Sequence, residues 1–590
     1  MRRFVLSLIA SFAFSSSLAA TTEGERFNGW LEAGWELVLV RFPILATSVG
    51  DPRYNDRMGN QATAEWRADN LKFQQQRLEE LKGFDRSALS ERDRLSYDVL
   101  MRSIEESIEG ERYPAWMQPL TQTFSFSNFL AVLGGGGSIQ PFRTVKDYDD
   151  WYERLSASLV IFDSMIANMR TGMAKGVVQP RALMEKVVPQ LNALASSDVE
   201  QSVFWGPIKS LPESIPPADR ERLTAKYRAL IQDRVIPAYR RLYSFVREDY
   251  LPKARPTTAW SDLPDGRAWY AYLVKVNTTT ELTPDEIHAI GQREVGRNLR
   301  LIDEVRNVMG FPGERQAFFK HMREDPRYYF TRPDDVLDGY RGLQRKINAT
   351  LPRLFNIAPK ADYEVRQVEA FRSASAAAAS YQSSSADGSR PGVFYVNALA
   401  LRRMPTYGME TLSLHEASPG HHFQLSIARE DTTLPKFRRF GTFNVAYVEG
   451  WALYAETLGK ELGLYTDPLQ WYGHLSGDQL RAMRLVVDTG LHHKDWTRQQ
   501  AIGYMMENSS MDEGDVVAEV ERYIANPGQA LGYKIGQLQI SRLRSDAEAA
   551  LGDKFDIKDF HRQVLMTGAV PMSVLSTNVQ EWVQRQKSRR

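Results

Sequence analysis

Hydrophobic positions recur with the period of an α-helix along most of the chain. In the clearest run, residues 223–250, nine apolar side chains follow one another at intervals of three or four positions, apart from one adjacent pair. This spacing places them on one face of a single long helix, which we expect to bend near Pro237.

A second helix is predicted from its start signal as well as from its periodicity. Thr283, Pro284 and Glu286 form a capping box with proline at the first helical position. Gly310 is expected to end this helix. The side chains predicted to point inward are Ile287, Ile290, Leu299, Ile302, Val305 and Val308.

Strand patterns are few, and the best is the apolar run 392–397. We therefore predict a mostly α protein with a small β-sheet. The glycine run 134–137 lacks the Lys-Ser/Thr ending of a phosphate-binding loop and is interpreted as a flexible connection. The small-residue run Ser373–Ser389 is either an ordinary surface loop or a mobile flap beside an active site.

The first twenty residues are typical of a secretory signal peptide. Arg2 and Arg3 give a positive start, and small residues up to Ala20 follow the apolar stretch. That stretch of about eleven residues is too short to span a bilayer, and no later segment has 18 uninterrupted apolar residues. We predict Sec-type export, cleavage near Ala19 or Ala20, no membrane span, and a periplasmic or secreted location.

Composition and charge exclude several classes of function. The 590 residues carry 74 Lys and Arg against 73 Asp and Glu, so the chain lacks the basic excess of a general nucleic-acid binder. There is no cysteine, which excludes disulfide scaffolds, thiolate zinc sites, cysteine nucleophiles and the lipid attachment site of a bacterial lipoprotein. A hydrophobic share of 43% is that of a globular protein, so disorder is excluded.

The histidines are unevenly distributed along the chain. Six of the nine lie in one stretch of fewer than 80 residues, which begins with His415-Glu416 and continues to Pro419-Gly420-His421-His422. A His-Glu pair followed by a histidine one turn later presents two imidazoles and a general base to one zinc ion. The usual interval between the two histidines is four residues, or about 6 Å along the helix axis.

The interval here is six residues, which on a regular helix places the second histidine about 120° away from the first. Pro419 cannot donate a hydrogen bond within the helix, and Gly420 tolerates unusual backbone angles. We therefore expect a bulge at residues 418–420 that returns His421 toward the metal. His422 is the alternative second ligand.

The third ligand is expected to be a carboxylate from a neighbouring helix. Glu449 and Glu456 are seven residues apart and share one helix face. Two glutamates normally lie on a solvated face, but the residues around this pair are mostly apolar. A buried carboxylate needs a partner, and a metal ion would provide one.

Further downstream, Arg484, Asp488 and His492 are spaced four apart and line one side of a helix. They form either a structural salt bridge with a capping histidine or a site in which Asp488 orients His492 to stabilise an oxyanion. Tyr533 lies in a glycine-rich stretch and is either a core tyrosine or a hydroxyl that points into a cleft.

The segments HEASPGHH, EGWALYAE, RLVVDTGLH and QALGYKIG together resemble the bacterial family called domain of unknown function 885. The stretches ELTPDEIHAIGQREV and DGSRPGVFYVN also resemble it, so the likeness spans most of the chain. The family is grouped with gluzincin-type zinc metallopeptidases, related in architecture to the thimet oligopeptidases. The resemblance therefore implies a large helical metallopeptidase-like body with a central cleft and a small sheet beside the zinc-binding helix.

The resemblance implies one Zn²⁺ per chain on His415, His421 and Glu449, with Glu416 as general base. It favours His421 over His422, because the Pro-Gly-His pattern is the hallmark of the family. Glu456 would support the ligands from behind, while His492 and Tyr533 would stabilise the oxyanion. We accordingly divide the chain into a signal peptide (1–20), an N-terminal helical subdomain (21–260) and a catalytic zinc-binding subdomain (261–590) that form one compact unit.

The expected function is zinc-dependent hydrolysis of short peptides. One alternative is a zinc hydrolase that acts on a non-peptide amide or ester, and another is an exported binding protein without catalysis. Manganese and cobalt also bind two histidines and a carboxylate. The sequence leaves the choice between exopeptidase and endopeptidase, the side-chain preference and the oligomeric state open.

Overall fold

The structure is a computed structural model that describes residues 22–123, 125–196, 198–368, 373, 377–384 and 391–588. The predicted signal peptide lies outside the described residues. The first helices are α1 (Glu23–Arg41), α2 (Pro43–Ser48), α3 (Ala64–Lys82), α4 (Glu91–Gly110), α5 (Phe126–Gly134), α6 (Val145–Ser158), α7 (Val160–Lys175), α8 (Arg181–Ser196), α9 (Gly206–Lys209), α10 (Pro217–Leu230), α11 (Ile236–Ser244) and α12 (Gly266–Thr278).

The second half of the chain is also mainly helical, which confirms the predicted fold class. Its helices are α13 (Pro284–Val308), α14 (Arg315–Glu324), α15 (Pro333–Thr350), α16 (Met409–Glu416), α17 (His421–Glu430), α18 (Val445–Thr457), α19 (Pro468–His493), α20 (Arg498–Glu507), α21 (Glu513–Ala525), α22 (Leu531–Leu551), α23 (Ile557–Thr567) and α24 (Met572–Ser588). Within the described residues, none of these helices combines the length and the apolar character that crossing a bilayer requires.

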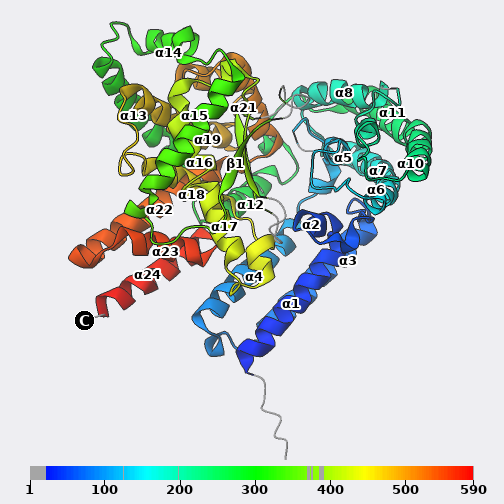
Figure 1. Cartoon of the computed structure of the whole chain (residues 1–590), viewed down its shortest axis with the longest axis horizontal. Coiled ribbons are helices and arrows are strands. Elements are labelled where there is room, and N and C mark those ends of the chain that lie inside the picture. Colours follow the sequence, from blue (N-terminus) through cyan, green and yellow to red (C-terminus); the bar gives the residue numbers. More distant parts are fainter. Residues whose placement is uncertain are drawn as a thin grey trace, which may run out of the picture.

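The predicted long helix forms from α10 and α11. They follow one another without a break through a π-helical turn at Ile231–Val235, which ends two residues before Pro237, and a second π-helical turn at Phe245–Tyr250 continues the helix. All nine predicted face residues are buried: Leu223, Tyr227, Leu230, Ile231, Val235, Tyr239, Leu242, Val246 and Tyr250. They belong to one hydrophobic core whose buried members all lie between residues 120 and 254. Figure 1 shows this part, α5 to α11, as a lobe beside the rest of the molecule.

Helices α1 and α4 contact the C-terminal half of the chain. The buried Arg438 donates hydrogen bonds to the hydroxyl of Ser96 in α4 and to the carbonyl of Thr567 at the end of α23. Arg585 of α24 pairs with Glu91 of α4 at 2.8 Å. Residues 120–254 form a hydrophobic core of their own, whereas α4 also binds the C-terminal half of the chain. The predicted subdomain boundary at residue 260 therefore stays a prediction.

The capping box of the second predicted helix is present at the start of α13. The Thr283 hydroxyl accepts from the backbone N–H of Glu286, whose carboxylate accepts from the backbone N–H of Thr283. Ile287, Ile302 and Val305 are buried as predicted. The expectation for Val308 is wrong, because this last helical residue is 72% exposed.

A three-stranded sheet lies beside the helices that carry His415 and His421. Its order is β1 (Tyr363–Gln367), β3 (Gly392–Val396) and β2 (Ala379–Gln382), with β1 parallel and β2 antiparallel to β3. The apolar face of the sheet shares a core with Met409 and Ala417 at the two ends of α16. The predicted strand at 392–397 is thus the central strand of the sheet.

The run Ser373–Ser389 is not a continuous loop, because β2 forms inside it. The backbone of this segment pairs with β3, which a small-residue composition alone does not indicate. Residues 374–376 and 385–389 of the run lie outside the described residues, so the flap stays a prediction there.

Candidate metal centre

The interval of six positions between His415 and His421 is accommodated by two helices, and the expected bulge in a single helix is wrong. Helix α16 ends at Glu416, and Ala417 leaves the helical conformation with φ −104° and ψ −120°. The chain turns through the cis Ser418-Pro419 peptide and resumes as α17 at His421. A Cβ atom on Gly420 would lie 1.9 Å from the carbonyl oxygen of His415, so the turn requires glycine at this position.

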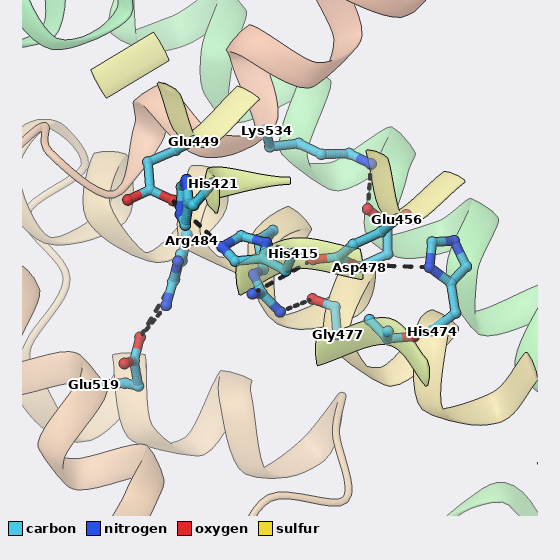
Figure 2. A network of polar contacts seen from close by, with 12 residues as sticks. His415, His421, Glu449, Glu456, His474, Gly477, Asp478, Arg484, Glu519 and Lys534 are labelled. Atoms are coloured by element: carbon cyan, nitrogen blue, oxygen red, sulfur yellow. Dashed lines mark hydrogen bonds and ion pairs between the residues drawn. The ribbon is translucent and has the colours of Figure 1, made fainter. Parts of the chain in front are cut away.

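This turn brings the two predicted histidine ligands together with the predicted carboxylate. The Nε2 atom of His415 lies 3.5 Å from Oε2 of Glu449, and the Nε2 atom of His421 lies 3.4 Å from the same oxygen. One possible ligand atom of each of the three residues lies within 4.8 Å of the others. Figure 2 shows the three side chains converging on one place.

The two separations between the histidine nitrogens and the Glu449 oxygen fit a single metal ion. Ligand atoms about 2.0–2.2 Å from a tetrahedral zinc ion lie roughly 3.3–3.6 Å from one another. The Oε2 atom of Glu449 is buried and has no hydrogen-bond partner among the described residues. Two imidazole nitrogens and one carboxylate are also a common donor set of catalytic zinc sites.

Helix α18 positions the carboxylates on both sides of His415. Glu449 faces Nε2, while Oε1 of Glu456 accepts a hydrogen bond from Nδ1 of the same ring at 2.8 Å. The second contact fixes the tautomer in which Nε2 is free to bind a metal. The indole of Trp451 on the same helix donates to the carbonyl of Pro419 at 2.8 Å and so ties α18 to the turn.

The electrostatics of the site follow from these carboxylate contacts. Burial opposes ionisation of Glu449, but His421 and His415 overcome it and hold the pKa of that carboxyl well below its usual range. Burial alone would lower the pKa of His415, but Glu449 and Glu456 raise it to about 9. The three side chains therefore stabilise one another through charge in a buried location.

The alternative ligand His422 points toward the sheet. Its Nδ1 atom lies 3.0 Å from the hydroxyl of Tyr381 in β2, and its ring packs against Tyr363 of β1 at a centroid distance of 4.8 Å. Burial lowers the pKa of His422 to about 4. The geometry therefore favours His421 as the second ligand.

Two predicted catalytic residues lie next to this centre. Glu416 is the last residue of α16 and is half-buried, and its carboxylate makes no hydrogen bond within the described residues. Tyr533 lies on α22, where the guanidinium of Arg484 stacks over its ring at 4.6 Å. Burial and the neighbouring Glu449 carboxylate raise the pKa of Tyr533 to about 12, so its hydroxyl is a donor at neutral pH.

His492 is not brought to the centre by any contact in the described part of the chain. Its Nδ1 atom accepts from the backbone N–H of Trp260 at 3.2 Å, and its Nε2 atom lies 3.0 Å from the carbonyl of Tyr523. Burial lowers the pKa of His492 to about 3. With both ring nitrogens bound to backbone groups, His492 has no free N–H for an oxyanion, and its catalytic role stays a prediction without geometric support.

The expected contact between Asp488 and His492 is corrected by the structure. Asp488 accepts hydrogen bonds from the hydroxyl of Tyr270 at 2.6 Å and from the backbone N–H of Gly528. Arg484 pairs instead with Glu519 of α21 at 3.1 Å. The four-residue spacing does put these side chains on α19, but Asp488 contacts Tyr270 of α12 and Gly528, whereas Arg484 and His492 both contact α21.

Sequence reasoning missed a buried ion-pair network behind Glu456. Oε2 of Glu456 lies 3.8 Å from His474, and Asp478, one turn further along α19, accepts from the fully buried ammonium of Lys534 at 2.6 Å. Figure 2 shows this network continuing from His415 away from the triad. The signal in the sequence was a lysine inside the otherwise apolar stretch QALGYKIG, since a buried lysine requires a paired carboxylate.

Comparison with known proteins supports one family assignment. Two solved structures match nearly the whole chain: a candidate lipoprotein from Colwellia psychrerythraea has a TM-score of 0.88 and 29% identity over 96% of this chain and 100% of its own. A candidate lipoprotein of unknown function from Shewanella oneidensis has a TM-score of 0.73 over 95% of this chain and 99% of its own, and at 16% identity it shows the fold alone. No curated protein matches the chain. The family model described as "Bacterial protein of unknown function (DUF885)" matches residues 43–579, and the chain therefore belongs to the DUF885 family.

Proposed function

We propose that the protein is a zinc-dependent metallohydrolase that cleaves short peptides. The observation that carries this proposal is the convergence of His415, His421 and Glu449, whose nitrogen and oxygen atoms lie at distances suited to one metal ion. Glu416, the residue after His415, is a base beside them. A structural zinc site usually has four protein ligands, whereas three ligands beside a potential base are typical of a catalytic one. Short peptides are proposed as substrates by analogy with the oligopeptidases that the sequence motifs resemble.

In the proposed mechanism the metal, when bound, supplies Lewis-acid polarisation and lowers the pKa of water. Glu416 takes the proton of the attacking water at its carboxylate and returns it to the leaving amine. The Tyr533 hydroxyl donates a hydrogen bond to the developing oxyanion, a type of contact whose loss costs about 10²–10³ in kcat. We assign this donor role to Tyr533 alone, because both ring nitrogens of His492 are occupied.

We propose in addition that the protein is exported. Residues 1–20 have the pattern of a signal peptide, and the two similar structures belong to candidate lipoproteins. The sequence has no cysteine for lipid attachment, which favours a free periplasmic or secreted form. Amino-terminal sequencing of the protein recovered from the periplasmic fraction tests this: a start near Thr21 supports export, and an intact Met1 contradicts it.

The metal proposal is tested by elemental analysis of the purified protein beside two matched variants. We expect about one zinc ion per chain in the wild type and in His422→Ala, and none in His421→Ala, because only His421 lies near the other two ligands. Absence of metal from the wild type, even after incubation with zinc, contradicts the proposal. Loss of metal from His422→Ala alone would move the second ligand to His422.

The catalytic proposal is tested with Glu416→Gln, which preserves the shape of the side chain. This variant is expected to retain zinc and to lose about 10²–10⁴ in kcat on a mixed peptide library, since it lacks the general base. Cleavage of amide or ester substrates without cleavage of any peptide would support the non-peptide hydrolase instead. A zinc-loaded wild type that cleaves neither class would leave an exported binding protein.

A further inference from the structure

A cavity of about 550 Å³ lies between α1, α3, α4 and the segment that leads into α18. Apolar side chains form much of its wall, including Leu31, Trp35, Phe73, Leu100 and Phe437. Figure 1 shows α1, α3 and α4 below the two larger parts of the molecule. The cavity is in the size range of small-molecule sites, and none of the predicted metal ligands lines it.

One charged side chain in this wall is buried without a hydrogen-bonding partner. Arg77 of α3 is only 9% exposed, and among the described residues its guanidinium donates no hydrogen bond. The neighbouring Glu80 lies 3.9 Å away, because its carboxylate accepts from the indole of Trp30 and the amide of Gln76, each at 2.8 Å. A buried guanidinium that lacks a hydrogen-bond acceptor costs free energy unless a ligand supplies one.

The guanidinium of Arg77 is nevertheless held firmly in place. It stacks over the ring of Trp30 at 3.4 Å, and a Cβ atom on Gly34 of α1 would lie 2.1 Å from its Nη2 atom. Burial lowers the pKa of Arg77 to about 10, which still leaves it charged at neutral pH. The fold therefore orients a cation at the cavity wall before any ligand arrives.

A second arginine lines the same cavity from α4. Arg102 donates from Nε to Glu106 at 2.6 Å, while its Nη2 atom is buried and has no partner among the described residues. Arg77, Arg102 and Glu106 are the only charged residues of the lining, so the cavity carries a formal charge of +1. At the rim, Phe443 exposes 64% of its surface.

We propose that this cavity is a second binding site, separate from the metal centre, for an anionic amphiphile. The ligand class has one carboxylate head group, which pairs with the guanidinium of Arg77, and an apolar chain that covers Trp35, Phe73 and Leu100. Charge-assisted hydrogen bonds from an arginine to a carboxylate supply the specificity for the head group. Burial of the chain against apolar walls supplies the remaining affinity.

Isothermal titration of the full-length protein with decanoate and with decan-1-ol, both below aggregation, tests the proposal. The two probes share a chain and differ in the charge of the head group. Decanoate is expected to bind at least about tenfold more tightly than the alcohol, because hydrogen bonds to a charged group contribute more than about 1.4 kcal/mol. In Arg77→Gln this difference is expected to disappear while the alcohol binds as before.

The matched control is Arg67→Gln, which removes another arginine of α3 that stacks over a tryptophan, Trp116, outside the cavity lining. It is expected to leave both affinities unchanged. Ser107→Phe places a ring in the cavity and is expected to abolish binding of both probes. Thermal unfolding of each variant checks that it folds.

Three outcomes would overturn the proposal. The first is no binding of decanoate with a Kd tighter than about 1 mM. The second is equal binding of decanoate and decan-1-ol by the wild type, which would remove the role of Arg77. The third is unchanged binding by Ser107→Phe, which would place the ligand elsewhere and does not depend on whether Arg77→Gln folds.

Discussion

His415 and His492 are both buried histidines on helices of the same half of the molecule, yet their surroundings have opposite effects. His415 is 4% exposed and has a carboxylate at each ring nitrogen, which raises its pKa to about 9. His492 is fully buried between backbone groups, and burial lowers its pKa to about 3. The difference shows that partners, rather than burial, decide whether a buried imidazole favours its charged or its neutral form.

The same comparison separates a proposed metal ligand from a structural residue. At His415 the carboxylate of Glu456 accepts from Nδ1 and orients the ring, while the carboxylate of Glu449 lies opposite Nε2. Histidines that bind metals typically have one ring nitrogen oriented in this way by a carboxylate. At His492 the ring connects the backbone at Trp260 to the backbone at Tyr523 and so joins three distant segments. Four predictions break or sharpen this comparison.

The largest effect is expected from Gly420→Ala. The new methyl group would lie 1.9 Å from the carbonyl oxygen of His415 and 2.3 Å from that of Leu414, so the turn between α16 and α17 must shift. We expect loss of zinc and a decrease of more than about 4 kcal/mol in the free energy of unfolding. Denaturant titration and elemental analysis measure the two effects.

Gly503→Ala is the matched control, because no atom lies within 4 Å of the added methyl group and the residue is inside α20. It is expected to retain zinc and to stabilise the protein by about 0.5–1 kcal/mol. Equal behaviour of the two variants would show that the turn does not depend on glycine at 420.

His492→Phe is expected to reduce the free energy of unfolding by about 2–4 kcal/mol, since it leaves a buried N–H and a buried carbonyl without partners. Zinc content and, in the folded fraction, kcat are expected to stay as in the wild type. Urea titration measures the first effect, and peptide assays measure the second. A large fall in kcat with normal folding would restore the predicted catalytic role of His492.

Glu456→Gln is expected to weaken zinc binding by about 10- to 100-fold, because the neutral amide no longer orients His415 as strongly. Competition with a chelator measures the change in Kd. The control is Glu461→Gln, which removes a half-exposed partner of Arg544 at the surface. Unchanged zinc affinity in Glu456→Gln would mean that the contact with Glu456 does not tune the ligand.

The smallest effect is the pH dependence of stability that His492 confers. Its pKa is about 3 in the fold against 6.5 for an ordinary histidine, so the unfolded chain binds more protons between these values. Stability from this residue is therefore present above pH 6.5 and is lost as the pH falls toward 3. Between pH 7 and 5 the wild type is expected to lose about 1–2 kcal/mol more than His492→Phe, measured by urea titration at each pH. Parallel losses in the two proteins would contradict the assignment.

Much of the fold follows from local patterns in the sequence. The periodicity of residues 223–250 and the capping box at Thr283 each correspond to a helix, because these signals depend on contacts only a few residues apart. The exposure of Val308 was not predictable in this way, since its periodicity continues to the end of α13. Whether a helix face is covered depends on which other element packs against it.

The chain of amino acids by itself indicated the candidate donors, His415 with either His421 or His422 and a glutamate, and the position at which a regular helix is interrupted, at Pro419 and Gly420. Only the tertiary structure decided between His421 and His422, because the turn sends one ring to Glu449 and the other to Tyr381. It also decided the surroundings of His492, whose partners are 232 and 31 residues away along the chain. Spacing along one helix specifies which side chains share a face, but the partners of that face come from distant segments and exist only once the chain has folded.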